Sequence, residues 1–198
     1  IAHVCPKLGG VNGRLMEPYI NRAFDGPQFD DILAVQRGYG DVLEKSGGND
    51  TASTAHVLGE LMATVPPKLT LGADANETQV TPNETDFISI DDDSDIDFFT
   101  FTLGSDSGVN LLLTPQGPTY LSGPQNENGS CSSGTNFDSS SQSDLTLTLF
   151  AADGSTTLET ANTGGLGDTE LIATTLTAGT YYVRVTGAQN AAQMYELE

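Results

Sequence analysis

The segments Phe99-Thr100-Phe101-Thr102-Leu103 and Leu145-Thr146-Leu147-Thr148-Leu149 alternate large apolar side chains with threonine. Successive side chains of a β-strand point to opposite faces, so each segment places its apolar residues on one face and its threonines on the other. Such strands fit an antiparallel sheet that has one face in a core and the other towards water. The two segments therefore predict an antiparallel β-sandwich.

Other short stretches have the same character, because they are rich in β-branched and aromatic residues and are separated by turn-forming residues. Seven strands at this spacing favour a mainly β fold of two packed sheets. The strands are expected at residues 87–90, 97–103, 109–114, 145–150, 169–175, 180–186 and 194–197. The stretch 115–143, rich in serine, glycine, asparagine and glutamine, is expected to be a surface loop.

The apolar positions of these strands predict the core. Adjacent residues of one strand face opposite sides, so Tyr182 and Val183 cannot both enter the same core. The expected core residues are Phe99, Phe101, Leu111, Leu113, Leu145, Leu147, Leu149, Ile172, Tyr182, Val183 and Val185.

The first part of the chain differs, and we expect one region at residues 1–43 and the sandwich at residues 44–198. Residues 1–26 are loop-like, whereas residues 27–40 predict a helix with a proline in its first turn and a glycine at its end. Phe29, Ile32, Leu33 and Tyr39 fall on or near one face of this helix. That apolar face needs a cover, which without the rest of a catalytic domain is the sandwich, another chain, or nothing ordered.

The formal charge of −20 is concentrated after residue 68, where one base, Arg184, stands against 19 acids. Nucleic acids and anionic membranes attract basic surfaces, so neither is an expected partner. An acidic surface suits divalent cations or a salty medium. The chain contains no apolar run long enough to span a bilayer, for which about 20 residues are needed.

The two cysteines, Cys5 and Cys131, form one disulfide in an oxidising compartment or are two unrelated thiols. Little lysine, with abundant serine, threonine, asparagine and glycine, is typical of extracellular β proteins. We therefore expect a secreted or cell-surface protein.

Two segments near the start resemble part of a zinc protease. Ile1-Ala2-His3 precedes Leu15-Met16-Glu17-Pro18, and residues 29–40 read Phe-Asp-Asp-Ile-Leu-Ala-Val-Gln-Arg-Gly-Tyr-Gly. They resemble the end of a matrixin-type catalytic domain of the metzincin class, where H-E-x-x-H-x-x-G-x-x-H is followed by a methionine turn and a last helix. The resemblance implies that His3 is the third zinc ligand of a parent enzyme and that Met16 lies in the methionine turn.

The same resemblance implies a structural role for Asp30 and Asp31, which would brace the methionine turn and the mature N-terminus. Two acids at a helix start also favour the helix through its macrodipole, whatever else they do. The chain has two histidines, His3 and His56, and no H-E-x-x-H, so it lacks two zinc ligands and the general base. We expect this chain alone to be inactive, with His56 as a packing residue.

The remainder of the chain resembles the bacterial pre-peptidase C-terminal domain, a secreted β-sandwich appended to many peptidases. The segment Ala178-Gly179-Thr180-Tyr181-Tyr182-Val183-Arg184-Val185 is similar to that family's G-T-Y-Y-V-R-V strand. Residues 90–101 are similar to its D-x-D-x-F-x-F strand, Tyr195-x-Leu197 to its last strand, and residues 44–58 to its E-x-N-D-T-x-x-A-x-x-L start. The chain departs from the pattern by a long insertion at residues 64–85.

Members of that family often hold calcium where the N-terminal linker meets an acidic strand. Calcium takes several hard oxygen ligands. Asp93, Asp95 and Asp97 alternate, so on a strand they would share one face. With Asn49 and Asp50 matching the linker ligands, these five residues are the expected calcium site, whereas Glu44 is displaced by the Gly47-Gly48 insertion. The alternative is a solvated acidic turn.

These observations favour the C-terminal fragment of a secreted zinc metallopeptidase, Zn²⁺ being the cofactor of the parent. Its sandwich would serve stability, secretion or targeting to a protein or polysaccharide matrix, and would pack against the missing catalytic portion. The rival hypothesis is a non-catalytic surface or adhesion module that associates with itself or with other surface proteins.

Overall fold

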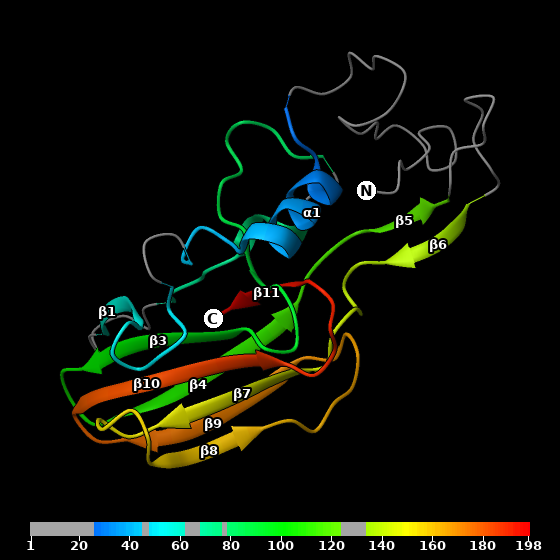
Figure 1. The fold of residues 1–198 in the computed structure, drawn as a ribbon. Helices are drawn as coiled ribbons and strands as arrows, with labels where there is room; N and C mark the ends of the chain where they lie inside the picture. The colour runs from blue at the N-terminus through cyan, green and yellow to red at the C-terminus, as the bar shows by residue number, and fades with distance from the viewer. Residues whose placement is uncertain (1–25, 45–47, 62–67, 77–78, 124–133) are drawn as a thin grey trace.

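The computed structural model describes residues 26–44, 48–61, 68–76, 79–123 and 134–198, and these form a two-sheet β-sandwich with one α-helix (Figure 1). One sheet, here called sheet A, has the order β1-β3-β10-β7-β8, and sheet B has the order β2-β11-β4-β9. The strands of sheet A are β1 (His56–Leu61), β3 (Ile96–Leu103), β10 (Gly179–Gly187), β7 (Leu145–Phe150) and β8 (Thr157–Ala161). Those of sheet B are β2 (Ile88–Ile90), β11 (Gln193–Leu197), β4 (Ser107–Pro115) and β9 (Glu170–Leu176).

The prediction of a mainly β sandwich preceded by a helix is confirmed, and each of the seven expected strands is present to within two residues at its ends. One pairing departs from the antiparallel pattern. β1 runs parallel to β3, with a bulge between Val57 and Gly59. A parallel neighbour needs a crossover connection, and the chain from β1 to β3 provides one that includes β2 and the 3₁₀ helix η2 (Ala73–Asn76).

The stretch 115–143 was expected to be a surface loop, but it also contains strands. It contains a hairpin of β5 (Thr119–Ser122) and β6 (Thr135–Asp138), which form a separate two-stranded sheet. The rings of Tyr120 and Phe137 face each other across this hairpin at a centroid distance of 5.1 Å. Its strands were missed because they are short and mostly polar.

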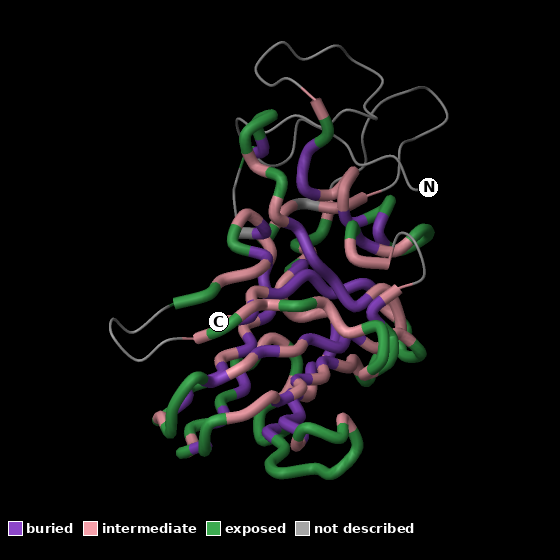
Figure 2. Tube along the Cα trace, turned by 90° about the vertical axis from the view of Figure 1, so that its left-hand side faces the viewer, coloured by how far each residue is buried: buried purple, intermediate pink, exposed green. Residues whose placement is uncertain are grey.

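The core lies between the two sheets, where Figure 2 shows the buried residues gathered along the strands. All the expected core residues are buried except Tyr182. In β10, Tyr181 faces the core with Val183 and Val185, and its ring stacks on Phe101 at 5.7 Å. Tyr182 lies on the opposite face, as the alternation of a strand requires.

Helix α1 (Phe29–Tyr39) packs on the sandwich through a second apolar cluster. Two buried glutamines fasten it, because Gln28 exchanges hydrogen bonds with the backbone of Val80 and Gln36 Nε2 donates to the carbonyl of Phe87. Of the covers that were expected for the apolar face of the helix, the structure shows the sandwich. The apolar residues of this cluster are Phe29, Leu33, Ala75, Val80, Phe87, Ala192 and Met194.

Tyr39 was expected on the covered face but is 86% exposed. At about 100° per residue it lies at the margin of the stripe that Phe29, Leu33 and Gln36 define. Within the described part of the chain, no helix is both long and apolar enough for a membrane span.

Candidate functional site

Two turns bring carboxylates together at the junction between α1 and the sandwich. Residues 41–44 follow the end of α1, and residues 91–95 connect β2 to β3. The second turn is shaped by its own acids, since Asp95 Oδ2 accepts the backbone N–H of Asp91 and Asp92 Oδ1 accepts that of Ser94, both at 2.7 Å. Arg37 of α1 donates to the carbonyl oxygen of Asp91 at 2.6 Å. Short-range bonds therefore hold the acidic turn against the helix.

Glu44, Asp91 and Asp95 form a triad, in which one carboxylate oxygen from each lies within 4.8 Å of the others. All three residues are partly buried. Glu44 Oε2 is buried and accepts no hydrogen bond from the described residues, whereas a hydrogen bond between the side chains of Glu44 and Asp95 acts to lower the pKa of Asp95. The triad thus brings three carboxyl groups close together and leaves one buried oxygen open to a ligand.

Gly40 makes room for Glu44. It ends α1 with φ at +70°, and a Cβ at this position would overlap the carboxylate of Glu44. Both the left-handed backbone and the close approach call for glycine. The residue that ends the helix therefore also allows the glutamate to fold back towards Asp91 and Asp95.

The electrostatics of the triad favour protonation. Burial, followed by the charges of Asp95 and Asp41, raises the pKa of Glu44 to about 8. Burial also raises the pKa of Asp95 to about 6, with the charge of Asp91 adding to the effect. The pKa of Asp91 is raised by burial and by Asp92, and Arg37 partly offsets this. Three ionised carboxylates at this distance repel one another. Near neutral pH a bound proton or a bound cation must therefore reduce their charge if they are to stay together.

Two buried aspartates lie behind the triad. Asp97 accepts hydrogen bonds from Asn49 Nδ2 at 2.8 Å and from the Tyr195 hydroxyl at 2.6 Å. Asp41 accepts the backbone N–H groups of Leu43 and Ser89. Burial raises the pKa of Asp41 and raises that of Asp97 well above its ordinary value. Both groups join the segments that flank the triad, and the charge of Asp41 adds to the negative field at Glu44.

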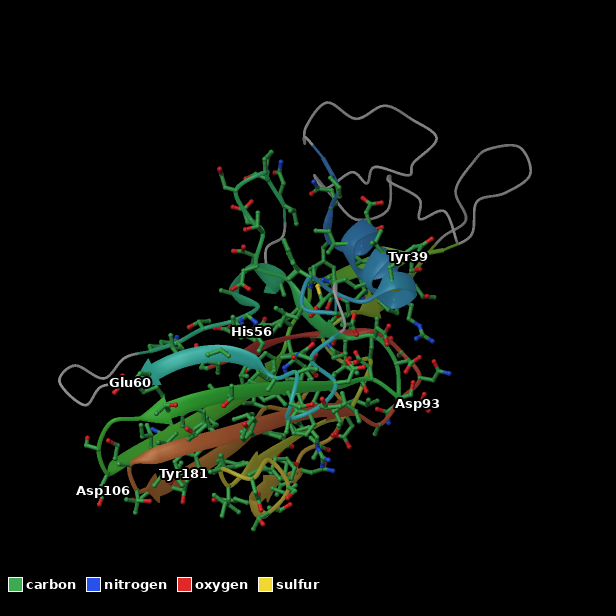
Figure 3. All side chains as sticks on the ribbon, turned by 60° about the vertical axis from the view of Figure 1, so that its left-hand side comes forward. Tyr39, His56, Glu60, Asp93, Asp106 and Tyr181 are labelled. Carbon is green, nitrogen blue, oxygen red and sulfur yellow. The ribbon has the colours of Figure 1, made fainter. Side chains whose placement is uncertain are left out.

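The residues expected to hold calcium are only partly brought together. Asn49 and Asp97 are in direct contact, and Asp95 belongs to the triad. Asp50 is exposed, and its charge contributes to the raised pKa of Asp91. Asp93 is exposed on the turn, as Figure 3 shows, because β3 begins only at Ile96 and the expected alternation does not extend back to it.

The sequence did not predict Glu44 and Asp91 as neighbours of Asp95, and it predicted neither Asp41 nor Tyr195 as a member of the site. Glu44 was set aside because of the glycine insertion, yet the turn after α1 brings it back to the acidic turn. The run of acids from residue 91 to 95 was the available signal for Asp91.

His3 and Met16, which were predicted for the zinc site of the parent enzyme, lie outside the described residues. The two cysteines, Cys5 and Cys131, also lie outside them. His56 is in β1, with its ring edge-on to Phe99 at 6.4 Å. Asp31 accepts the backbone N–H of Gln28 at 3.0 Å and so caps the start of α1. The bracing role of Asp30 and Asp31 in a parent enzyme stays a prediction.

A groove of about 810 Å³ lies elsewhere, along β1, β3 and β4. Its lining is mainly leucine, phenylalanine and valine, and its charged members are Lys68 and Glu198, which form an ion pair. This lining contains neither histidine nor cysteine. The groove therefore offers apolar surface rather than catalytic groups.

Comparison with known proteins yields no matching family model and no matching curated protein sequence. Among solved structures, the crystal structure of the pre-peptidase C-terminal domain of a collagenase from Bacillus anthracis is similar to this chain with a TM-score of 0.40 and 16% sequence identity. The match covers 73% of this chain and 92% of that one.

Proposed function

We propose that residues 44–198 are a non-catalytic accessory domain of a secreted zinc metallopeptidase, and that calcium held by Glu44, Asp91 and Asp95 fastens the segment after α1 to the sandwich. The observation that carries the calcium assignment is the triad of carboxylates within 4.8 Å of one another. The assignment to a peptidase rests on the sequence motifs around His3 and at residues 178–185.

The donor set fits calcium. Calcium–oxygen distances are about 2.3–2.6 Å, so two oxygens on one ion lie at most about 5 Å apart. The triad meets that limit and supplies hard, negatively charged oxygens. Zinc sites in proteins are usually built with histidine or cysteine, and the triad contains neither. The unsatisfied Glu44 Oε2 and the exposed carboxylate of Asp50, which is close enough to act on Asp91, support the same ligand class.

The proposed role of the ion is structural. Glu44 comes from the segment after α1, whereas Asp91 and Asp95 come from the turn between β2 and β3. An ion bound by all three would cross-link these segments and replace mutual repulsion by shared attraction. Because Glu44 must lose its proton to bind, calcium affinity should increase as the pH approaches 8.

Calcium is expected to raise the melting temperature of the folded chain, because it binds the folded state and not the unfolded one. At 100 times its dissociation constant the gain in stability is about 2.7 kcal/mol. Glu44→Gln should lose most of this response, while in a chelator it should be at least as stable as the wild type, because glutamine resembles the protonated acid. Differential scanning calorimetry in calcium, magnesium and chelator measures both effects.

Asp93→Asn is the matched control, since Asp93 is an exposed acid of the same turn and should leave the calcium response unchanged. A wild-type melting curve that is the same in calcium and in chelator would contradict the calcium site. The alternative interpretation, a solvated acidic turn, would then remain. An equal loss of response in Asp93→Asn and Glu44→Gln would show a diffuse charge effect rather than a site.

The proposed parent enzyme is tested by the coding sequence before Ile1. If His3 is the third zinc ligand, H-E-x-x-H-x-x-G should end directly before Ile1, since two residues separate that glycine from the last histidine. Its absence would contradict the peptidase assignment and leave the surface-module hypothesis. If the motif is present, deleting residues 44–198 from the full enzyme measures what the domain contributes to stability, to secretion or to binding of a protein or polysaccharide matrix.

A further inference from the structure

The two large sheets have four edges, and edges are where a β protein can pair with another strand. β1 and β8 bound sheet A, and β2 and β9 bound sheet B. An edge strand has unpaired backbone N–H and C=O groups along one side, so proteins usually protect it by shortness, bulges or charge.

Three of these edges carry such protection. β2 is only three residues long. β1 has a bulge between Val57 and Gly59 and an acid, Glu60, near its end. β8 pairs irregularly with β7 between Leu149 and Phe150 and has Glu159 at its centre. These features discourage pairing with a further strand.

β9 lacks these features. It has seven residues, Glu-Leu-Ile-Ala-Thr-Thr-Leu, in unbroken register with β4, and contains neither proline nor a basic residue. Its one charged residue, Glu170, is buried at the first position and accepts the backbone N–H groups of Thr163 and Gly164. Leu171 is 52% exposed on the outer face, where Ala173 and Thr175 are also exposed. β9 is thus a long and regular edge with no exposed charge.

We propose that the β9 edge pairs antiparallel with β9 of a second copy, so that sheet B continues across a two-fold axis. A pairing centred on Ala173 places Ala173 opposite itself and Leu171 opposite Thr175 of the second copy, with no like charges facing each other. The same operation on β8 would place Glu159 opposite Glu159. A second copy fits this edge because β9 has no exposed charge, so neither of the two paired strands brings a charge against the other. This interface is remote in sequence from the calcium triad and does not depend on it.

Sedimentation equilibrium of the 198-residue chain tests the interface, at several protein concentrations and in low and high salt. The expected result is a monomer–dimer equilibrium that shifts towards dimer in high salt, because screening reduces the repulsion between two copies of net charge −20. Ala173→Lys places two lysines opposite each other and should weaken the dimer by about tenfold.

Leu158→Lys is the control, because Leu158 is 47% exposed on the other long edge, β8, and should leave dimerisation unchanged. Ala173→Glu should also weaken the dimer, and a mixture of Ala173→Lys with Ala173→Glu should restore it as a heterodimer. Circular dichroism confirms that each variant is folded. A wild type that stays monomeric at all concentrations and salts would overturn the proposal, as would an equal effect of Leu158→Lys or a mixture that fails to pair.

Discussion

In a chelator, the folded protein is expected to lose about 4 kcal/mol of stability as the pH rises from about 4.5 to about 8. Burial raises the pKa of Glu44 to about 8 and that of Asp95 to about 6, above their values in the unfolded chain. The folded state therefore keeps protons that the unfolded state has released. The stability that these protons supply is complete below the unfolded pKa and is lost as the pH rises through the folded pKa. The magnitude counts half of each of these two shifts, because both carboxyls are partly exposed. The raised pKa values of Asp41, Asp91 and Asp97 act in the same direction and add to the loss.

Calorimetry between pH 4.5 and 8.5 in chelator measures this loss, and Glu44→Gln should flatten its upper part. Hydrogen bonds from serine and threonine lower the pKa values of Asp92, Asp138 and Asp153, so their titration affects stability only at more acidic pH. Calcium should oppose the loss, because it takes the place of the departing proton. A wild-type stability that is constant or increases over this interval in chelator would contradict the account of the triad.

The substitution Asp97→Ala is expected to lower the free energy of unfolding by about 3 kcal/mol. Asp97 is fully buried, and its two oxygens accept hydrogen bonds from the Asn49 amide and the Tyr195 hydroxyl. Burial raises the pKa of Tyr195 well above its ordinary value, so this hydroxyl remains a protonated donor. Removing the carboxylate leaves two buried donors without an acceptor and opens a small cavity. Urea denaturation followed by circular dichroism measures the change.

Asp97→Asn separates hydrogen bonding from charge. Asparagine has nearly the same size and keeps one acceptor oxygen, and it cannot carry the negative charge that burial and the charges of Asp41 and Asp95 disfavour at this position. It should therefore lose less than half of what alanine loses. If alanine and asparagine had equal effects, the two hydrogen bonds would not be what makes Asp97 important.

The strands that were predicted from the sequence bury most of their apolar residues. β4 and β10 bury every second residue over most of their length, β7 buries all its apolar residues, and β3 buries all of them except the partly buried Ile96. β8 has four exposed residues out of five, and β1 is partly buried throughout except at its exposed Val57 and Glu60. Neither strand has a periodic pattern of apolar residues that would reveal it in the sequence. Both form because they pair with a neighbouring strand, β1 with β3 and β8 with β7.

The candidate site was less predictable, because its members converge through topology. The acidic run and Asn49 were visible in the sequence, and the contact of Asn49 with Asp97 agrees with the expected meeting of linker and strand. Glu44 reaches the triad only because Gly40 ends α1 and leaves space beside it. Tyr195 is 98 residues from Asp97, and only the placement of β11 brings the two together. Spacing along a chain carries no information about such pairs.

The position of β11 has a consequence for the order in which the protein acquires its structure during synthesis. β11, which Figure 1 labels near the C-terminus, is the last strand of the sandwich, yet it lies inside sheet B and is hydrogen-bonded to β2 on one side and to β4 on the other. Until residue 197 has left the ribosome, β2 has no neighbour in its sheet and the Tyr195 hydroxyl is not there for Asp97. The nascent sandwich therefore stays open until nearly the whole of it has emerged, a state that a translocation channel, which passes unfolded chains, can still accept.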